Sequence, residues 1–354
     1  MSAYLLKYGI HHHVLEAWGL NPQSIRQLTD GHINQTFLLN MGDHRLVLQK
    51  VNSIFGSEVH SDIQAVVKRL SEFKIPVPSL VRTKAKELFL NDFQNENWRL
   101  MTFLPGVTTE RISSTRQATN VGIMVGALHA ALYHWDYDYK NKRSGVHDTA
   151  SHRKAIENTI GSKRSHRLLS KVEPLYEKVA KRFKDLEQLD TLPQRHAHGD
   201  LKVTNIRFDG RDETQVAGIL DLDTFAQMPL IFEMGDAFRS WCNTATEDDS
   251  SSTFDAAIFS HGARGWWSIL KEVDIEPSEV ESLVSGIEWI TLELSTRFLR
   301  DALEESYFGW DDTMFRRSGE HQLQRALGQL SLAASIAEQK PTLEKLWEQI
   351  RISV

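Results

Sequence analysis

Hydrophobic positions divide the chain into a first part with short strand-like runs and a longer second part with helical spacing. In the first part, Val59, Ile63, Val66 and Leu70 mark one face of a helix expected over 58–73. After residue 106, helical spacing dominates at 116–133, at 167–188 and from about 253 onward. Strands are expected at 25–28, 36–40, 46–48, 81–83, 88–90 and 98–101.

This pattern predicts a bilobal α+β fold. The small lobe has an antiparallel sheet and one helix, and the larger lobe is mostly helical. Pro105 and Gly106 interrupt the periodicity between them. We therefore expect an N-lobe at 1–102, a hinge at 103–106 and a C-lobe at 107–354.

Two short apolar segments with a turn between them stand beside a run of polar residues in the expected C-lobe. The segments are 206–208 and 216–220, and the Asp209-Gly210 pair is typical of a tight turn. If the segments pair antiparallel, the start of the first lies next to the end of the second. Asn205 and Asp221 are then neighbours, with Asp200 in the preceding loop.

These residue types suit phosphoryl transfer. A carboxylate such as Asp200 can orient an attacking hydroxyl and accept its proton. The amide oxygen of Asn205 and the carboxylate of Asp221 are hard ligands for Mg²⁺ carried on nucleotide phosphates, and Lys202 can reach the transferred group. The protein-kinase catalytic loop has the same order of Asp, Lys, Asn and metal-binding Asp. The alternative is a set of ordinary polar loop residues around a hairpin.

The motif His198-Gly199-Asp200 with Asn205, followed by Ile-Leu-Asp-Leu-Asp at 219–223, resembles the aminoglycoside phosphotransferase and choline kinase superfamily. Blocks at 30–36, 47–55, 235–239 and 297–301 are closest to N-acetylhexosamine 1-kinase and its relatives. The resemblance implies a protein-kinase-like fold, with ATP (or GTP) and Mg²⁺ as cofactors and the nucleotide between the lobes. It also implies transfer of the γ-phosphoryl group to a hydroxyl of a small metabolite.

The resemblance places the nucleotide contacts in the N-lobe and the hinge. Gln49 stands where many relatives have a phosphate-binding Lys or Arg, although hexosamine kinase-like sequences also have Gln there. The loop with Gly31, His32 and Asn34 is expected to cover the phosphates; for His32, a plain hairpin loop is the alternative. The base is expected against the hinge, at Met101, Phe103 and Leu104.

Four residues are expected to contact the acceptor. Asp223 follows Asp221 by two, so on an extended segment the two share a face, where Asp223 can touch the acceptor or a second metal ion. Arg297 resembles a sugar-contacting arginine of hexosamine kinases, and a surface ion pair with Asp301 is an equal alternative. The other two are Tyr307 and Arg325. His198 and Asp236 are expected to support the catalytic loop, with Asp236 hydrogen-bonded to it.

The resemblance favours as acceptor a sugar or amino sugar, phosphorylated at its anomeric hydroxyl. Alternatives with the same chemistry are an aminoglycoside, choline or another amino alcohol, and homoserine. An aminoglycoside pocket should be acidic, whereas Arg297, Tyr307 and Arg325 favour a neutral or acidic sugar. A non-catalytic nucleotide-binding module, suggested only by Gln49, is a further alternative.

Composition and charge restrict the class of protein, its cellular compartment and its partners. The net charge of −6 over 354 residues disfavours a nucleic-acid binder. The single cysteine, Cys242, excludes an internal disulfide and suits a reducing compartment. A signal-peptide pattern is lacking, and no apolar run approaches the ~18 residues of a membrane span. We therefore expect a cytoplasmic monomer or homodimer that binds a nucleotide and a small metabolite, without a membrane or nucleic-acid partner. Dehydrogenase, α/β-hydrolase and zinc-enzyme motifs are absent from the sequence.

Overall fold

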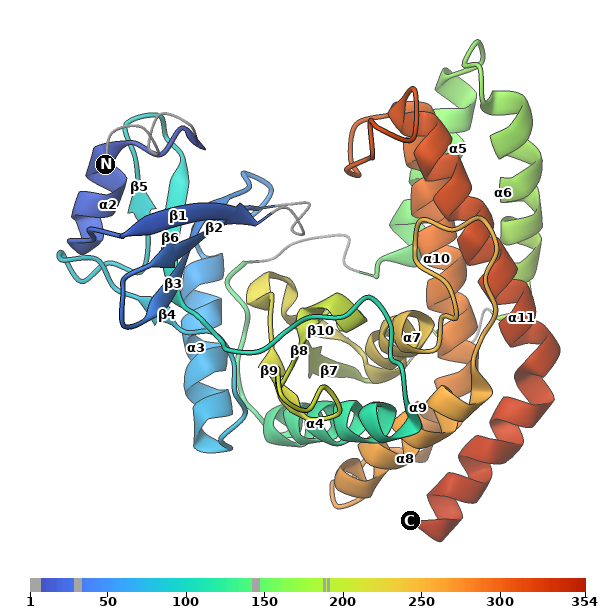
Figure 1. The fold of residues 1–354 in the computed structure, drawn as a ribbon. Helices are drawn as coiled ribbons and strands as arrows, with labels where there is room; N and C mark the ends of the chain where they lie inside the picture. The colour runs from blue at the N-terminus through green and yellow to red at the C-terminus, as the bar shows by residue number, and fades with distance from the viewer. Residues whose placement is uncertain (1–7, 29–33, 142–146, 187–188, 190–191) are drawn as a thin grey trace. The chain divides into compact units, whose positions relative to one another are not determined.

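The computed structural model describes residues 8–28, 34–141, 147–186, 189 and 192–354, and the chain forms two compact units (Figure 1). Unit 1 comprises Met1–Pro105 and Asp136–Arg143, and unit 2 comprises Gly106–Trp135 and Ser144–Val354. The first boundary falls within the expected hinge at 103–106. Residues 136–143 differ from the expectation, because they belong to unit 1 and not to the larger helical unit.

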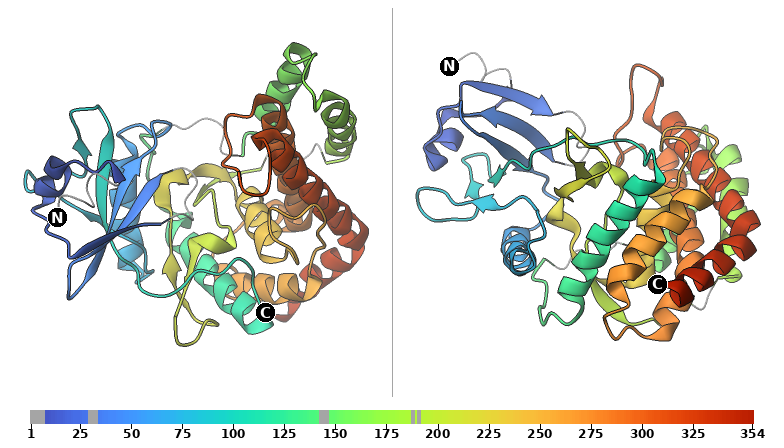
Figure 2. Two further views of the ribbon diagram at one scale, coloured as in Figure 1. Left: turned by 45° about the horizontal axis from the view of Figure 1, so that its top comes forward. Right: turned by 60° about the horizontal axis from the view of Figure 1, so that its bottom comes forward.

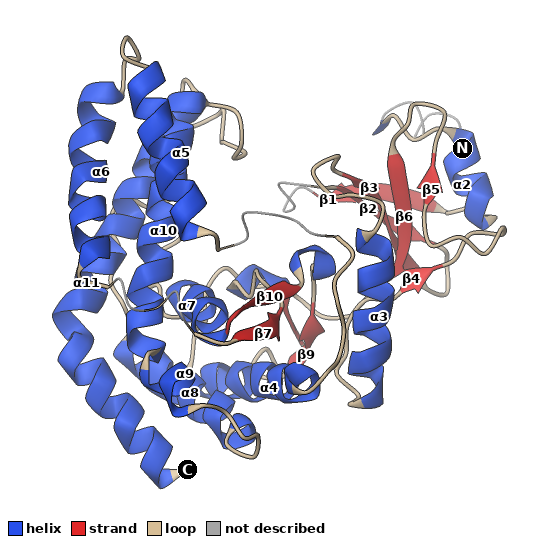
Figure 3. Ribbon diagram, turned by 180° about the vertical axis from the view of Figure 1, so that it is seen from behind, coloured by secondary structure: helices blue, strands red, loops and turns tan. Residues whose placement is uncertain are grey.

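Unit 1 is built on an antiparallel sheet in the order β1-β2-β3-β6-β4, with β5 also paired to β6 (Figure 3). Phe37, Leu39 and Leu48 point into its core together with residues of helix α2, His12–Trp18. Each strand predicted from the alternation is present, although β4 and β5 have two residues each. The strands are β1 Ser24–Leu28, β2 Gln35–Asn40, β3 Arg45–Val51, β4 Leu80–Val81, β5 Leu90–Asn91 and β6 Asn97–Thr102.

Helix α3, Val59–Glu72, confirms the predicted helix of unit 1 and explains why 136–143 joins that unit. Asp62 on α3 is buried, and its carboxylate accepts a hydrogen bond of 2.7 Å from the Tyr137 hydroxyl. The same carboxylate accepts backbone N–H bonds from Lys140 at 3.0 Å and from Asn141 at 2.8 Å. These hydrogen bonds offset the free-energy cost of burying the charged Asp62 carboxylate.

Unit 2 is mainly helical, as the periodicity predicted, with two additional helices, α5 and α7, that the sequence did not indicate. Helices α4 and α8 lie side by side in both views of Figure 2. Glycines permit this close contact, because a Cβ on Gly122 would lie 2.1 Å from the Gly262 carbonyl oxygen. The helices are α4 Thr115–Tyr133, α5 Thr149–Ser162, α6 Leu169–Lys184, α7 Leu230–Trp241, α8 Ala256–Leu270, α9 Pro277–Glu281, α10 Leu283–Glu304 and α11 Ser318–Ser353.

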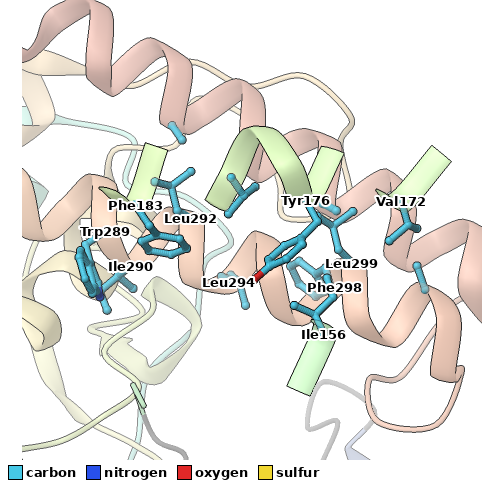
Figure 4. Close-up of a cluster of buried hydrophobic side chains, with 14 of the residues drawn as sticks. Ile156, Val172, Tyr176, Phe183, Trp289, Ile290, Leu292, Leu294, Phe298 and Leu299 are labelled. Atoms are coloured by element: carbon cyan, nitrogen blue, oxygen red, sulfur yellow. The ribbon is translucent and has the colours of Figure 1, made fainter. Parts of the chain in front are cut away.

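A hydrophobic core joins α5, α6, α10 and α11 (Figure 4). Trp289 and Phe298 on α10 are buried in it, and the Trp289 ring meets the Phe183 ring of α6 at 5.1 Å between centroids. The core fixes α10, whose inward positions also include Glu293. Of the helices in the described part of the chain, none is long and apolar enough to span a bilayer.

Two small antiparallel ladders carry the polar motif of unit 2. Strand β7, Gln194–Ala197, pairs with β10, Ala226–Pro229, and β8, Ile206–Phe208, pairs with β9, Val216–Ile219. Ile206 lies opposite Ile219, which confirms the predicted hairpin. The polar loop at 198–202 leads from β7 into this hairpin.

Candidate active site

The β8–β9 hairpin brings the two ends of the polar motif together. Beyond the Ile206–Ile219 pair, the Leu220 backbone N–H donates to the Asn205 carbonyl oxygen at 2.8 Å. Asp221 follows directly after Leu220. The sequence prediction that Asn205 and Asp221 are neighbours is therefore confirmed by the backbone pairing.

Asp200 lies at the centre of this group. Its Oδ2 accepts hydrogen bonds from Lys202 Nζ at 2.8 Å and from Asn205 Nδ2 at 3.0 Å. Asn205 Nδ2 also donates to the Asp200 carbonyl oxygen at 2.8 Å, which turns Asn205 Oδ1 away from the loop. No residue in the described part of the chain donates to Asp200 Oδ1 or to Asn205 Oδ1. Each side chain thus keeps one oxygen available for a ligand.

Charge pairing keeps Asp200 ionised. Burial alone would raise the pKa of Asp200, but the charge and hydrogen bond of Lys202 lower it below its ordinary value. The pKa of Lys202 is raised in turn, because the negative charges of Asp200 and Asp221 outweigh its burial. An Asp with a low pKa is a weak proton acceptor in the ground state. The arrangement therefore favours a carboxylate that first orients a hydroxyl.

Asp221 ends the hairpin in a left-handed conformation, with φ of 61°. The next three residues form a 3₁₀ turn, Leu222–Thr224. Asp223 is part of this turn and is buried, so the expectation of an extended segment with Asp221 and Asp223 on one face is wrong.

Three carboxylates crowd the end of the hairpin. Although Asp221 reaches solvent, desolvation by the surrounding protein and the negative charges of Asp223 and Asp200 raise the pKa of Asp221 to about 6. Such mutual repulsion is relieved by a bound cation. Within the described residues, no group of three His, Cys, Asp or Glu side chains is arranged to hold a metal ion. The donors fit a cation held by one amide, one carboxylate and a ligand's phosphates, the arrangement that Mg²⁺ favours.

Glu233 on α7 holds the backbone of the loop. Its two carboxylate oxygens accept N–H bonds from His198 and Gly199, each at 2.7 Å. We expected this role for Asp236, and that expectation is wrong: Asp236 Oδ1 instead accepts from Arg239 at 2.7 Å. Only the fold reveals which acid of α7 faces the loop. The sequence signal for Glu233 is weak, namely an acid within a run of apolar residues.

His198 links the loop to the hairpin. Its Nδ1 accepts from the Asp200 backbone N–H at 3.3 Å, so Nε2 carries the proton and donates to the Leu220 carbonyl oxygen at 2.8 Å. The imidazole thus joins the backbone of Asp200 to the residue before Asp221. This placement agrees with the expected supporting role.

Arg297 on α10 is half-buried beside two aromatic rings, with its guanidinium carbon 5.9 Å from the Tyr307 ring centroid and 5.5 Å from that of Phe308. The alternative of an ion pair with Asp301 does not hold. Asp301 instead accepts backbone N–H bonds from Ser306, Tyr307 and Phe308, each at 2.9 Å. No hydrogen bond joins the Arg297 guanidinium to another described residue. Tyr307 itself is exposed.

Arg325 does not have a guanidinium available for an acceptor, contrary to our expectation. It is buried on α11, donates to the Gly309 carbonyl oxygen at 3.0 Å and forms an ion pair of 2.5 Å with Asp248. These bonds tie the α10–α11 connection to the loop after α7. Arg325 therefore anchors two loops of unit 2.

In unit 1, Gln49 is held between strands. Its Nε2 donates to Thr36 Oγ1 at 3.0 Å, and its Oε1 accepts from Arg99 Nε at 2.8 Å. Arg99 is buried and lies directly opposite Gln49 in the β3–β6 register. The sequence did not single out Arg99, because only strand pairing reveals that it lies beside Gln49.

The other residues expected to contact the nucleotide are placed as follows. Asn34 Oδ1 accepts from the Asn52 backbone N–H at 2.9 Å. Met101 is buried in β6, Leu104 is half-buried, and the Phe103 ring lies 4.0 Å from the Arg45 guanidinium carbon. Gly31 and His32 lie outside the described residues.

The chain matches a known family in sequence and known structures in fold. Residues 24–267 match the profile of the phosphotransferase enzyme family. An aminoglycoside phosphotransferase from Alicyclobacillus acidocaldarius is similar with a TM-score of 0.60 and 13% identity, over 95% of this chain and 97% of that one. Choline kinase from Cryptosporidium parvum gives 0.60 and 14%, over 98% and 99%. An amicoumacin kinase in complex with AMP-PNP and Ca²⁺ gives 0.59 and 11%, over 99% and 93%.

Proposed function

This chain belongs to the phosphotransferase enzyme family, and we propose that it transfers the γ-phosphoryl group of ATP (or GTP) to a hydroxyl of a sugar or amino sugar. The family match establishes a phosphotransferase, and the similarity to solved structures shows the fold of small-molecule kinases. The nucleotide, the metal and the acceptor class are the proposed part.

The observation that carries the proposal is that only one of the two Asp200 carboxylate oxygens is hydrogen-bonded within the described part of the chain. Oδ2 is held by Lys202 and Asn205, whereas Oδ1 receives no hydrogen bond from another described residue. A fixed carboxylate with one available oxygen is suited to accept a hydrogen bond from an acceptor hydroxyl. The oriented hydroxyl then attacks the γ-phosphorus, the bond from this phosphorus to the β–γ bridging oxygen breaks so that the nucleoside diphosphate leaves, and the hydroxyl proton passes to Asp200.

Asn205 and Asp221 are the residues we assign to Mg²⁺. The available Oδ1 of Asn205 and the crowded carboxylate of Asp221 support this assignment. When bound, the ion neutralises charge on the nucleotide phosphates. Lys202 places its positive charge beside Asp200, where it stabilises negative charge on the moving phosphoryl group. Positioning and electrostatics therefore supply most of the acceleration.

In unit 1 we assign nucleotide contacts to the sheet around Gln49. Many relatives have a cation at this position. Here the neighbouring cation is Arg99, hydrogen-bonded to Gln49 across the strands. We propose that this pair replaces the single Lys or Arg in binding the phosphates.

A neutral or acidic acceptor fits better than a polycation. Arg297 presents a half-buried guanidinium without a hydrogen bond to another described residue. Such a cation repels the ammonium groups of an aminoglycoside or of an amino alcohol, and it can hydrogen-bond sugar oxygens. Because Arg325 is bound by Asp248 and the Gly309 carbonyl oxygen, the preference for a neutral or acidic acceptor rests on Arg297.

The test is a phosphorylation screen with ATP and magnesium over hexoses, N-acetylhexosamines, aminoglycosides, choline and homoserine, with ADP release as the readout. We expect turnover with a hexose or N-acetylhexosamine. Asp200→Asn should abolish transfer and change Mg-nucleotide affinity only a few-fold, whereas Asp221→Ala should weaken both. Equal turnover in Asp200→Asn and the parent protein would refute the assignment of Asp200, and turnover only with amino alcohols or aminoglycosides would refute the acceptor class.

A further inference from the structure

A cavity of about 480 Å³ lies in unit 2 where the helices α4 and α8 begin. One wall is the segment 109–113 before α4, and a second is Glu213 in the β8–β9 turn. The third wall runs from the end of α7 to the first turn of α8. The volume is in the range of small-molecule sites. The residues assigned above to catalysis and to the metal do not line this cavity.

Hydrogen bonds between segments distant in sequence fix the walls. Arg111 Nη1 donates to the Thr244 carbonyl oxygen at 2.8 Å, which joins the first wall to the third. Gln117 on α4 is buried, and its Nε2 donates to the Glu213 carbonyl oxygen at 3.0 Å. The cavity is therefore a fixed feature of unit 2.

A buried amide with an unused donor lines the cavity. Asn243 is 8% exposed, and its Oδ1 accepts from the Ala245 N–H at 2.9 Å and from the Ser252 hydroxyl. Its Nδ2 donates to no other residue in the described part of the chain. Polar groups of buried residues are almost always hydrogen-bonded. Asn243 Nδ2 is therefore suited to donate to an oxygen of a ligand.

Three carboxylates make the cavity negative. Asp255 is half-buried, and its Oδ1 caps α8 by accepting two backbone N–H bonds at 2.8 and 3.0 Å. Its Oδ2 accepts no bond from another described residue. Glu110 and Glu213 are exposed, and neither forms an ion pair within the described ranges. Arg111 is the one cation among the lining residues, so the field in the cavity attracts a positive ligand.

We propose that this cavity binds a small organic cation with an ammonium group and an oxygen acceptor. The ammonium donates to Asp255 Oδ2 and to the carboxylates of Glu110 and Glu213, and the oxygen accepts from Asn243 Nδ2–H. The carbon chain between them contacts two buried isoleucines of the lining. A bare metal ion fits less well, because no three His, Cys, Asp or Glu side chains of the described residues are arranged to hold one.

The cavity adjoins the catalytic loop. Trp241, a buried residue of the third wall, donates its indole N–H to the Leu201 carbonyl oxygen at 2.9 Å. Leu201 follows Asp200 directly. The proposed site is thus next to the loop but outside the group formed by Asp200, Asn205 and Asp221. The test must therefore distinguish it from the nucleotide site.

The probe is L-lysine dimethylamide, which has two ammonium groups, a carbonyl oxygen and no hydroxyl for phosphorylation. Its diacetylated form lacks both charges, and cadaverine lacks the carbonyl. Isothermal titration calorimetry with the full chain measures the dissociation constant of each compound. We expect the probe to bind about 10-fold or more tightly than the diacetylated form and about 3-fold more tightly than cadaverine.

Conservative variants test the individual contacts. Asp255→Asn keeps an oxygen to cap α8 and should weaken the probe about 10-fold, whereas Glu213→Gln, at an exposed position, should weaken it about 2-fold. Asn243→Asp keeps an oxygen acceptor and loses the donor, so the preference for the probe over cadaverine should disappear. Glu177→Gln, exposed on α6 and outside the lining, is the control and should bind like the parent protein. A thermal shift checks that each variant is folded.

Several results would overturn the proposal. They are no binding of the probe up to about 10 mM, equal binding of the probe and its diacetylated form, or equal affinity in Asp255→Asn and Glu177→Gln. Displacement of the probe by saturating Mg-ATP would place it in the nucleotide site and also reject the proposal, whereas an unchanged dissociation constant supports it. The titration measures binding alone, so a protein that phosphorylates no acceptor of the screen would refute the proposed function and leave this inference standing.

Discussion

Glu233 binds the backbone N–H groups of His198 and Gly199 with its two oxygens, each at 2.7 Å. Burial alone would raise the pKa of Glu233, but the hydrogen bond from His129 and the backbone N–H bond from Gly199 lower it, so the carboxylate remains ionised. His129 Nδ1 accepts from Trp266 Nε1 at 2.9 Å, which directs its Nε2 toward Glu233. The loop that carries Asp200 is therefore fixed to the α4–α8 contact.

We expect Glu233→Gln to impair the enzyme without touching a substrate. The amide nitrogen cannot accept an N–H bond, so one backbone donor is left buried and unpaired. We expect a loss of about 1–3 kcal/mol in the free energy of unfolding and up to about 100-fold in kcat, because small displacements of a catalytic group are costly. Chemical denaturation and steady-state kinetics measure both.

The control for this prediction is Glu338→Gln, at an exposed position whose side chain has no hydrogen bond or ion pair among the described residues. It should leave stability and kcat unchanged. A Glu233→Gln protein with parental kcat would show that the loop keeps its position without this carboxylate.

Local signals in the sequence predicted the centre of the site. The Asp209-Gly210 turn and the apolar runs on either side fix the β8–β9 register, and with it the pairing of Asn205 beside Leu220. Asp200 and Lys202 are two residues apart, so their ion pair requires little more than the correct loop. Short-range geometry of this kind can be derived from sequence alone.

The errors have a different physical origin. Asp221 and Asp223 alternate with an apolar residue, as in a strand, but the left-handed backbone of Asp221 begins a turn that no glycine marks. Glu233 and Asp236 are one helical turn apart, and only the packing of α7 decides which of them faces the loop. Arg325 was misassigned because its partner, Asp248, is distant in sequence. Tertiary contacts determine each of these cases.

Arg325 should stabilise unit 2 by joining two loops. Its guanidinium binds Asp248 and the Gly309 carbonyl oxygen. Asp248 is exposed, so solvent screens the pair, and we expect Arg325→Gln to lower the free energy of unfolding by about 1–2 kcal/mol. Thermal and chemical denaturation measure this loss. Arg316→Gln, at an exposed arginine, is the matched control, and equal stability of the two variants would contradict the anchoring role.

The His147–Glu293 pair makes stability depend on pH in two directions. Burial alone would raise the pKa of Glu293, but the hydrogen bond and charge of His147, with a contribution from His152, lower it from 4.5 to about 2. The contribution of Glu293 is therefore fully present above pH 4.5 and is lost as the pH falls toward 2. The pKa of His147 is raised above 6.5, so its contribution is present below pH 6.5 and is lost as the pH rises through the folded-state pKa.

Between pH 4.5 and pH 6.5 both groups contribute to stability. The charge of Asp236 also raises the pKa of His147, whereas the charge of Arg297 lowers it. We expect Glu293→Gln to be most destabilising at about pH 5.5, with a smaller difference from the parent protein at about pH 3. Denaturant unfolding of both proteins across this range measures the difference. A difference that does not vary with pH would show that the pair does not titrate as the geometry predicts.

Gly106, the first residue of unit 2, allows the backbone to pack closely against the β8–β9 hairpin. Its φ is 120°, and a Cβ would lie 2.0 Å from the Phe208 carbonyl oxygen, which accepts from the Val107 N–H at 2.9 Å. Gly106→Ala should therefore break the hydrogen bond between Val107 and Phe208 and lower the free energy of unfolding by about 1–3 kcal/mol from backbone strain alone. It should also shift β8, which begins next to Asn205. Gly161→Ala is the control: nothing lies within 4 Å of its Cβ position on α5, so alanine should stabilise by about 0.5–1 kcal/mol. Opposite shifts in melting temperature are expected, and equal shifts would exclude the close approach at Gly106.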